Sequence, residues 1–178
     1  ISEFNGTVNS GPEATIIHEA THQLAYNTGL HSRMGENPRW IVEGLATVFE
    51  APGIRNASKN RTVASRINRG RFVHFGNFAA KRYKRKSLEA YLASDKMFET
   101  NMSDAYAQAW AFSFFLIETR PRKYGKLLKT IAARKPLLKY TAEQRVADFR
   151  EIVADNLPLL EAEFLRYMAR IHERGKKP

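Results

Sequence analysis

The chain lacks three features that would each point to a particular class of protein. It has no cysteine among its 178 residues, which excludes disulfide bonds and thiolate metal sites. No apolar run approaches the ~20 residues of a membrane-spanning helix, so we expect no membrane span. No signal peptide is visible. Because the chain starts at Ile1 rather than Met, we expect a processed product or a fragment, and an extracytoplasmic location, either periplasmic or secreted.

Acidic residues are missing from residues 51–87, here called the basic segment. It holds 11 of the 29 Lys and Arg residues and none of the 18 Asp and Glu residues. The remainder has 18 basic and 18 acidic residues, so the whole net charge of +11 belongs to this segment. The segment could be a solvated surface, a surface for acidic or polyanionic substrates or a cell-envelope polymer, or a nucleic-acid face. No zinc-finger or RNA-binding signature accompanies it, so we do not expect nucleic acid as its partner.

A His-Glu-x-x-His motif at residues 18–22 is the clearest chemical signal in the chain. On a helix, residues i and i+4 lie on one face about one turn apart, so His18 and His22 can present two imidazole nitrogens to one zinc ion. Glu19 projects beside them, where a carboxylate can take a proton from water at the metal and pass it to a leaving amine.

The setting of this motif separates a metal site from the alternative, which is a pair of ordinary half-buried histidines. Ile16, Ile17, Leu24 and Ala25 make the segment apolar, so we expect a buried core helix that ends at Gly29. Polar side chains on such a helix need a reason to be there. We therefore favour the metal site.

A third ligand is needed, because catalytic zinc usually has three protein ligands and a water. Glu43 is our candidate, because it lies inside an apolar run from Trp40 to Phe49 and a carboxylate there needs a charge partner or a metal. We expect Asn37 to cap this helix, Pro38 to occupy its first turn, and Gly44 to allow another backbone to come close. His31, in the preceding loop, is the rival ligand.

The two motifs together resemble the gluzincin zinc metallopeptidases, and most nearly the peptidase-MA-like bacterial families. HExxH is followed about twenty residues later by Trp-x-x-Glu-Gly-x-Ala, at Trp40 to Ala46. The resemblance implies that His18, His22 and Glu43 bind Zn²⁺ and that Glu19 is the general base. One departure is Thr47, because many gluzincins carry an acidic residue one turn after the glutamate ligand. The groups that orient the histidines are therefore not identified.

Tyr106 is our candidate for stabilising the oxyanion of the tetrahedral intermediate. It lies near the start of a helix, capped by Asn101 or Ser103, that is apolar nearly all round and should be buried. A core tyrosine bonded to backbone is the alternative interpretation. His74 is the second candidate donor, and Tyr26 is expected to serve packing.

The coarse pattern predicts a mainly α fold with at most a small β element, in residues 1–9 or 71–75, and the resemblance implies a zincin-like helical core. We expect a basic helix over residues 78–86. We expect one catalytic domain over residues 1–178, which an upstream N-terminal part could complete. The predicted function is a zinc-dependent metallopeptidase that acts on peptides or proteins. The alternative is a non-catalytic binding domain on the same scaffold, using the basic segment for a polyanion or protein partner.

Overall fold

The computed structural model describes residues 11–55 and 62–174. Within them the backbone forms ten α-helices, one short 3-10 helix and no strand, which confirms the prediction of a mainly α fold. The expected β element at residues 1–9 lies outside the described residues. The elements are α1 (Pro12–Asn27), α2 (Arg39–Phe49), α3 (Pro52–Arg55), η1 (Val63–Arg66), α4 (Arg69–Lys81), α5 (Leu88–Ala93), α6 (Lys96–Thr100), α7 (Met102–Thr119), α8 (Pro121–Ala132), α9 (Ala142–Ile152) and α10 (Leu157–Arg174).

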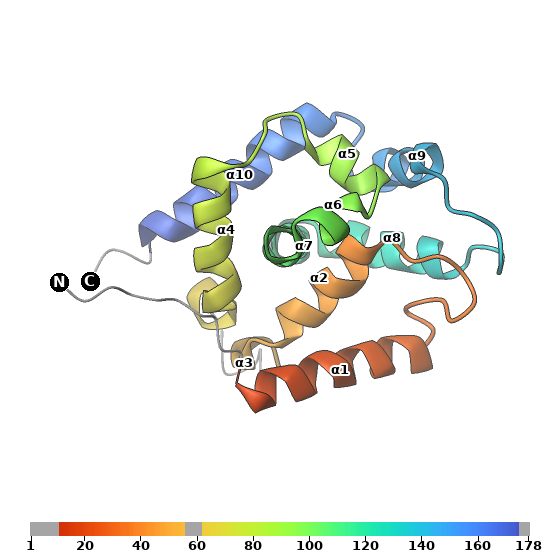
Figure 1. Cartoon of the computed structure of the whole chain (residues 1–178), viewed down its shortest axis with the longest axis horizontal. Coiled ribbons are helices and arrows are strands. Elements are labelled where there is room, and N and C mark those ends of the chain that lie inside the picture. The colour runs from red at the N-terminus through yellow and green to blue at the C-terminus, as the bar shows by residue number, and fades with distance from the viewer. Residues whose placement is uncertain (1–10, 56–61, 175–178) are drawn as a thin grey trace.

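Helix α7 occupies the centre of the molecule, where Figure 1 shows it end-on with the other helices around it. Helices α2, α4, α6, α8 and α10 all pack against it. Its large side chains are removed from solvent, with Trp110, Phe112 and Phe114 each 0% exposed. This confirms the prediction of a helix buried on nearly every side, which is what an all-round apolar sequence requires.

Helix α2 lies between α7 and α1 and contacts both. Gly44 makes the approach to α7 possible, because a Cβ at this position would lie 2.7 Å from the Ala109 carbonyl oxygen and 2.1 Å from Ser113 Oγ. The expectation that Gly44 admits another backbone is confirmed, and the backbone is that of α7. The close packing fixes α2, and with it the neighbouring residue Glu43, against the rigid centre of the fold.

Helix α1 lies at the edge of the molecule (Figure 1), and the prediction that it is a buried core helix is wrong. Ile16 is 66% exposed and Leu24 is 63% exposed, while Ala25 is its one buried residue among those described. The reason is that α1 packs mainly on α2, so only one of its faces is covered. Its end is as predicted, because Gly29 follows it with a φ of 71°, a conformation that glycine adopts without strain.

Helix α4 replaces both the strand expected at residues 71–75 and the basic helix expected at residues 78–86, so these two predictions are wrong. The helix starts after Asn68, whose side chain accepts a hydrogen bond from the backbone N–H of Arg71. Phe75 and Phe78 fall three residues apart and are both buried. This spacing places them on one face of a helix, and tertiary burial of that face decides between helix and strand.

The start of α2 differs by one residue from the prediction. Pro38 is the N-cap residue and the helix begins at Arg39, with no side-chain cap. Asn37 instead holds the preceding loop, because its side chain accepts a bond from the N–H of Ser32 and donates one to the Ser32 carbonyl oxygen, at 3.1 and 2.7 Å.

None of the helices in the described part of the chain combines the length and the hydrophobicity needed to cross a membrane.

Candidate metal centre

Three sequence-predicted ligands come together where α1 packs on α2. The Nε2 atoms of His18 and His22 are 3.0 Å apart. Oε2 of Glu43 lies 3.2 Å from the first nitrogen and 3.5 Å from the second. The three side chains are mostly shielded from solvent, with exposed fractions of 13%, 19% and 15%. In the described residues, this is the one group of His, Asp and Glu whose ligand atoms are close enough to hold a metal.

The spacing of these three atoms fits a zinc ion. Zinc lies about 2.0–2.2 Å from its nitrogen and oxygen ligands, so neighbouring ligands of a tetrahedral site are about 3.3 Å apart. The observed separations of 3.0, 3.2 and 3.5 Å lie on both sides of that value. Oε2 of Glu43 is also buried without a hydrogen-bond partner. Nitrogen and oxygen ligand atoms at these separations can hold one cation between them.

Glu50, at the end of α2, orients the first histidine. Its Oε1 accepts a hydrogen bond of 2.8 Å from Nδ1 of His18. Because a carboxylate only accepts, this bond fixes a proton on Nδ1 and turns Nε2 toward the other two ligands. Glu50 is itself fixed by Asn68, whose amide donates to Oε2 at 2.6 Å, and by Arg71 at 3.8 Å.

The sequence analysis missed Glu50, although a signal was present. The gluzincin pattern has an acidic residue one turn after the glutamate ligand, and this position is Thr47 here. The Thr47 hydroxyl donates a hydrogen bond to the Glu43 carbonyl oxygen. Glu50 is two turns after Glu43 on the same helix face, so helical periodicity would have found it.

The charges in this cluster shift the pKa values of its members in opposite directions. Burial alone lowers the pKa of His18, but hydrogen bonds to Glu43 and Glu50 outweigh burial and raise it to about 9. Burial raises the pKa of Glu43, but its contacts with the two histidines lower it to about 2. Glu43 is therefore ionised at neutral pH, and the site attracts positive charge.

Glu19 is an exposed residue directly after His18, on the part of α1 that other helices leave open. A helix turns by about 100° per residue, so its carboxylate lies beside the ligand cluster rather than within it. It is not one of the three grouped ligand residues. An ionisable side chain next to the ligand cluster in the sequence that remains accessible to water is a candidate general base.

Tyr106 lies against the ligand cluster from the side of α7. Its ring centroid is 6.4 Å from that of His18, and the side chain is half-buried. Burial raises the pKa of Tyr106, the charge of Glu43 and a hydrogen bond to it raise it further, and Arg39 opposes the change. The hydroxyl therefore stays protonated at neutral pH and faces the cluster, so it can act as a hydrogen-bond donor there.

The rival ligand His31 is buried close to this site but does not join it. It is 2% exposed, and its atoms are not among the three grouped ligands. Burial, followed by the charge of His22, lowers the pKa of His31 to about 4, so the ring is neutral. Tyr26 packs against it edge-on, with ring centroids 5.6 Å apart, which matches the packing role expected for Tyr26.

The second candidate donor, His74, belongs to another group. Its Nε2 hydrogen-bonds to Oδ1 of the buried Asp104 at 2.8 Å. Arg82 donates to both oxygens of the same carboxylate at 2.8 and 2.6 Å, and the amide of Asn101 donates at 2.7 Å. These four residues are called the Asp104 cluster below. The Nε2 atom of His74 is therefore engaged by Asp104, and His74 is not among the grouped ligand residues.

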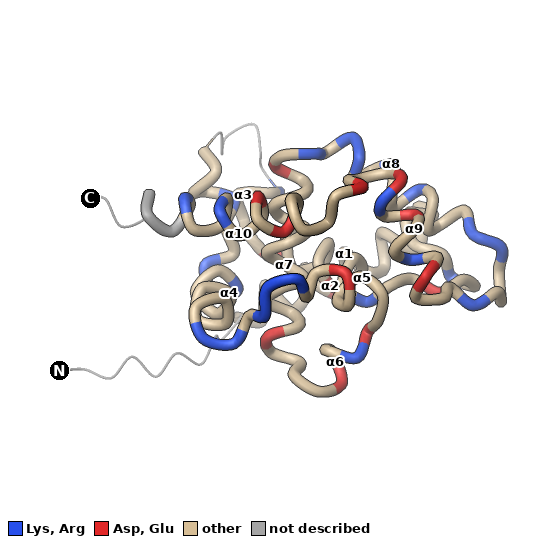
Figure 2. Tube along the Cα trace, turned by 90° about the horizontal axis from the view of Figure 1, so that it is seen from above, with Lys and Arg blue, Asp and Glu red and all other residues tan. Residues whose placement is uncertain are grey.

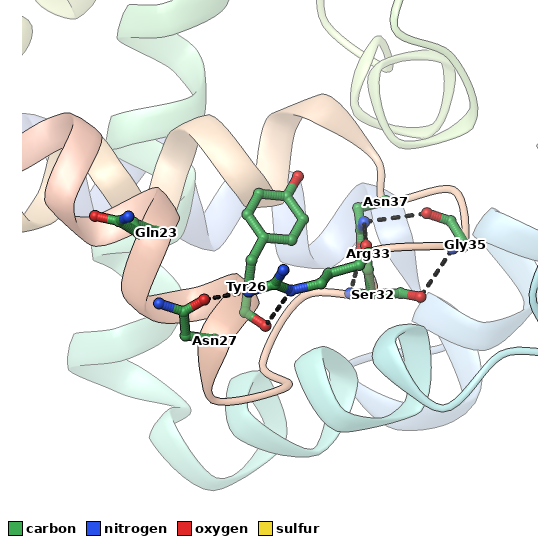
Figure 3. A pocket seen from close by; sticks show the side chains of 7 residues that line it. All are labelled: Gln23, Tyr26, Asn27, Ser32, Arg33, Gly35 and Asn37. Atoms are coloured by element: carbon green, nitrogen blue, oxygen red, sulfur yellow. Dashed lines mark hydrogen bonds between the residues drawn. The ribbon is translucent and has the colours of Figure 1, made fainter.

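An open pocket of about 670 Å³ begins one residue after His22 on α1. Figure 3 shows the side chains of α1 on one side of it and the following loop on the other. The loop is held by its own hydrogen bonds, including one of 2.8 Å from the Gly35 N–H to Ser32 Oγ. The lining is mostly polar and consists of Gln23, Tyr26, Asn27, Ser32, Arg33, Gly35 and Asn37.

The fold and this site define a class: a helical protein in which two adjacent helices carry a His-His-Glu cluster suited to a divalent cation. The chain belongs to the family described as "Protein of unknown function (DUF1570)", whose model matches residues 13–138. The matched part contains all three cluster residues, Glu50 and Tyr106. No curated protein and no solved structure matches the chain.

Proposed function

We propose that this protein is a zinc-dependent hydrolase, and specifically a metallopeptidase of the gluzincin type. The observation that carries the proposal is the convergence of three ligand atoms from His18, His22 and Glu43 at separations that suit tetrahedral zinc. The resemblance of the HExxH and Trp-x-x-Glu-Gly-x-Ala motifs to those of gluzincins supports the same conclusion. Both motifs lie within residues 13–138, the part of the chain that the family model matches.

The residues of the site divide the work of peptide hydrolysis. His18, His22 and Glu43 would hold zinc, which supplies a Lewis acid that makes water a nucleophile near neutral pH. Glu19 takes the proton of the attacking water and delivers it to the leaving amine. The Tyr106 hydroxyl donates a hydrogen bond to the oxyanion as negative charge develops on the carbonyl oxygen. Glu50 keeps the His18 ring in the tautomer that leaves Nε2 free.

The open pocket beside His22 gives an extended substrate a place to lie. It extends along α1 from Gln23 to Asn27 and is mostly polar, so it suits the backbone amides of a peptide. Arg33 is already engaged there with Asn27 and with the Tyr26 carbonyl oxygen (Figure 3). The loop side of the pocket is therefore ordered before a substrate arrives.

A second candidate function, a binding domain without catalysis, is favoured by one observation on the basic segment. Lys81, Lys84, Arg85 and Lys86 are all exposed, and Figure 2 shows a run of basic residues between α4 and α5. This run is held by Glu161, which accepts bonds from the backbone N–H groups of Lys86 and Leu88 at 2.7 and 3.1 Å. Such a fixed cationic loop would suit a polyanionic partner.

Glu19→Gln tests the proposed enzyme directly. The variant keeps all three ligands, so zinc should still bind at about one equivalent per chain, measured by elemental analysis. The amide cannot take a proton at neutral pH, so turnover should fall by at least ~100-fold. The assay is a broad peptide library read by mass spectrometry. Equal cleavage by both proteins would mean a contaminating protease, and a chain refolded with zinc that stays metal-free would refute the metal centre itself.

A further inference from the structure

Two arginines lie against Tyr106 at the edge of the ligand cluster, and the proposed chemistry does not use them. The Arg71 Cζ atom of α4 lies 5.2 Å from the Tyr106 ring centroid. The Arg39 Cζ atom of α2 lies 4.8 Å from the ring centroid of Phe98, which in turn is 5.6 Å from that of Tyr106. Segments far apart in sequence therefore place two cations around one aromatic pair.

Neither guanidinium forms a close ion pair with a carboxylate of the described residues, although Arg39 interacts with the Tyr106 side chain. In the described part of the chain, no carboxylate lies within 4.0 Å of the Arg39 guanidinium. Asp95 accepts a bond from the Arg39 backbone N–H, but its other oxygen pairs with Arg145 at 3.0 Å. Arg71 approaches Glu50 only to 3.8 Å and is 24% exposed. Arg39 is half-buried, so both side chains are held by aromatic rings and remain accessible.

The contacts connect both arginines to the ligand cluster. Glu50, the neighbour of Arg71, is hydrogen-bonded to His18. Tyr106, which interacts with both arginines, also interacts with Glu43, and its ring is tilted against that of His18. A guanidinium held over a ring keeps its planar fork of donors free for a planar anion. The combination of an accessible arginine pair and a hydrolytic centre therefore points to substrates that carry a carboxylate close to the bond being cleaved.

We propose that Arg39 and Arg71 form a carboxylate-binding subsite, so that the enzyme selects peptides with a free carboxylate beside the scissile bond. This inference rests on the proposed hydrolase function. The carboxylate is either the C-terminal group of the peptide or the side chain of Asp or Glu. In either case Tyr106 lies between the reacting carbonyl group and the anion that positions it.

Binding to the zinc-loaded Glu19→Gln protein tests the subsite without turnover. The three probes are dansyl-Ala-Ala-Phe-Ala with a free C-terminus, the C-terminal amide of the same peptide, and the C-terminal amide of dansyl-Ala-Ala-Asp-Ala. Their binding is measured by fluorescence anisotropy at about 0.15 M salt, where non-specific electrostatic attraction is screened. At least one carboxylate probe should bind ~10-fold or more tighter than the uncharged amide, as a charge-assisted pair provides. Which of the two binds tells the C-terminal group from the acidic side chain.

Substitutions in the same background assign the preference to the arginines. Arg39→Gln and Arg71→Gln should each reduce the preference to about 3-fold or less. Arg71→Lys keeps a charge beside Glu50 and should preserve zinc content, but it loses the bidentate fork and should lose most of the preference. Arg69→Gln is the matched control, because Arg69 is an exposed arginine of α4 and its change removes the same charge.

The outcomes separate this inference from the proposed function. Equal binding of all three probes, no measurable binding of any, or equal loss in Arg69→Gln would each overturn the subsite. A carboxylate preference without cleavage of any peptide by the wild type would leave the subsite standing and refute the hydrolase. Cleavage by the wild type with no carboxylate preference would support the hydrolase and refute the subsite.

Discussion

Two clusters in the described part of the chain combine histidine with carboxylate, and their difference shows how a candidate metal site can be told from a structural anchor. The His18, His22 and Glu43 atoms converge as acceptors, and a buried oxygen of Glu43 lacks a partner. In the Asp104 cluster the carboxylate receives bonds from Arg82, His74 and Asn101. In the second cluster a permanently charged arginine holds the carboxylate, whereas in the first the partners of Glu43 are two histidines, which are also metal ligands when they lose their protons.

The pKa shifts of the two carboxylates, Asp104 and Glu43, also have different causes in the two clusters. The hydrogen bonds from Arg82 are the main cause that lowers the pKa of Asp104. Burial opposes this change, and the hydrogen bond from His74 lowers the pKa further. The carboxylate of this cluster is therefore stabilised by donors that belong to the fold. In the first cluster the ionised Glu43 is stabilised by His18 and His22. A substitution in one cluster should therefore leave the other cluster unchanged.

Glu43→Gln should give the largest effect on metal binding. The change keeps the size of the side chain and removes its negative charge, so a ligand is lost outright. Because changes to residues that only orient a ligand cost 10–100-fold, we expect zinc affinity to fall by at least ~100-fold. The measurement is competition with a zinc chelator. Unchanged affinity would move the third ligand elsewhere, with His31 as the first candidate.

Glu50→Gln should give an intermediate effect. The amide can still accept the hydrogen bond from His18 but no longer stabilises the imidazole by charge, so zinc affinity should fall by about 10–100-fold. Glu118→Gln is the matched control, because Glu118 is similarly shielded and pairs with Arg66 at 2.6 Å away from the ligands. A similar loss of zinc in both variants would remove the special role of Glu50.

Asp104→Asn should leave zinc content unchanged and reduce stability instead. It replaces a buried carboxylate that is 1% exposed, and Arg82 and His74 lose their charged partner. Arg82 is 47% exposed, so water solvates it in the variant, and we expect a loss of about 1–3 kcal/mol in the free energy of unfolding. Urea denaturation measures this. Loss of zinc at unchanged stability would contradict the separation of the two clusters.

The pH dependence of stability should show the smallest effect. Because the folded pKa of Asp104 lies below its ordinary value of 3.8, its contribution is complete above that value and is lost as pH falls through the folded pKa. The difference in unfolding free energy between wild type and Asp104→Asn should therefore shrink as pH is lowered from about 5 toward 3. A constant difference over that range would show that the carboxylate charge contributes nothing.

Local periodicity explains which parts of the site were predictable from sequence. His18 and His22 share a helix face because they are four residues apart, a relation that no tertiary contact can change. Glu43 was noticeable because a carboxylate within an apolar run needs a partner. The same periodicity, followed one turn further than Thr47, would have reached Glu50. The end of α1 at Gly29 and the mainly α fold are equally local properties.

Long-range packing decided everything that depends on how the helices meet. The exposure of Ile16 and Leu24 arises because α1 is covered on one face only, and no pattern within the helix records that. Burial of Phe75 and Phe78 made one helix out of a segment whose short-range pattern suggested a strand followed by a helix.

The sequence by itself determined the chemistry that was available: two histidines on one helical turn, a glutamate beside them, a second glutamate in an apolar helix, and no thiol. Only the tertiary structure decided that Glu43 lies 3.2 Å from His18, and that Arg39 and Arg71 flank Tyr106. The physical reason is that backbone geometry fixes relations within a helix. The close approach of α2 to α7 at Gly44, and the packing of α1 and α4 around it, fix which side chains of different helices meet.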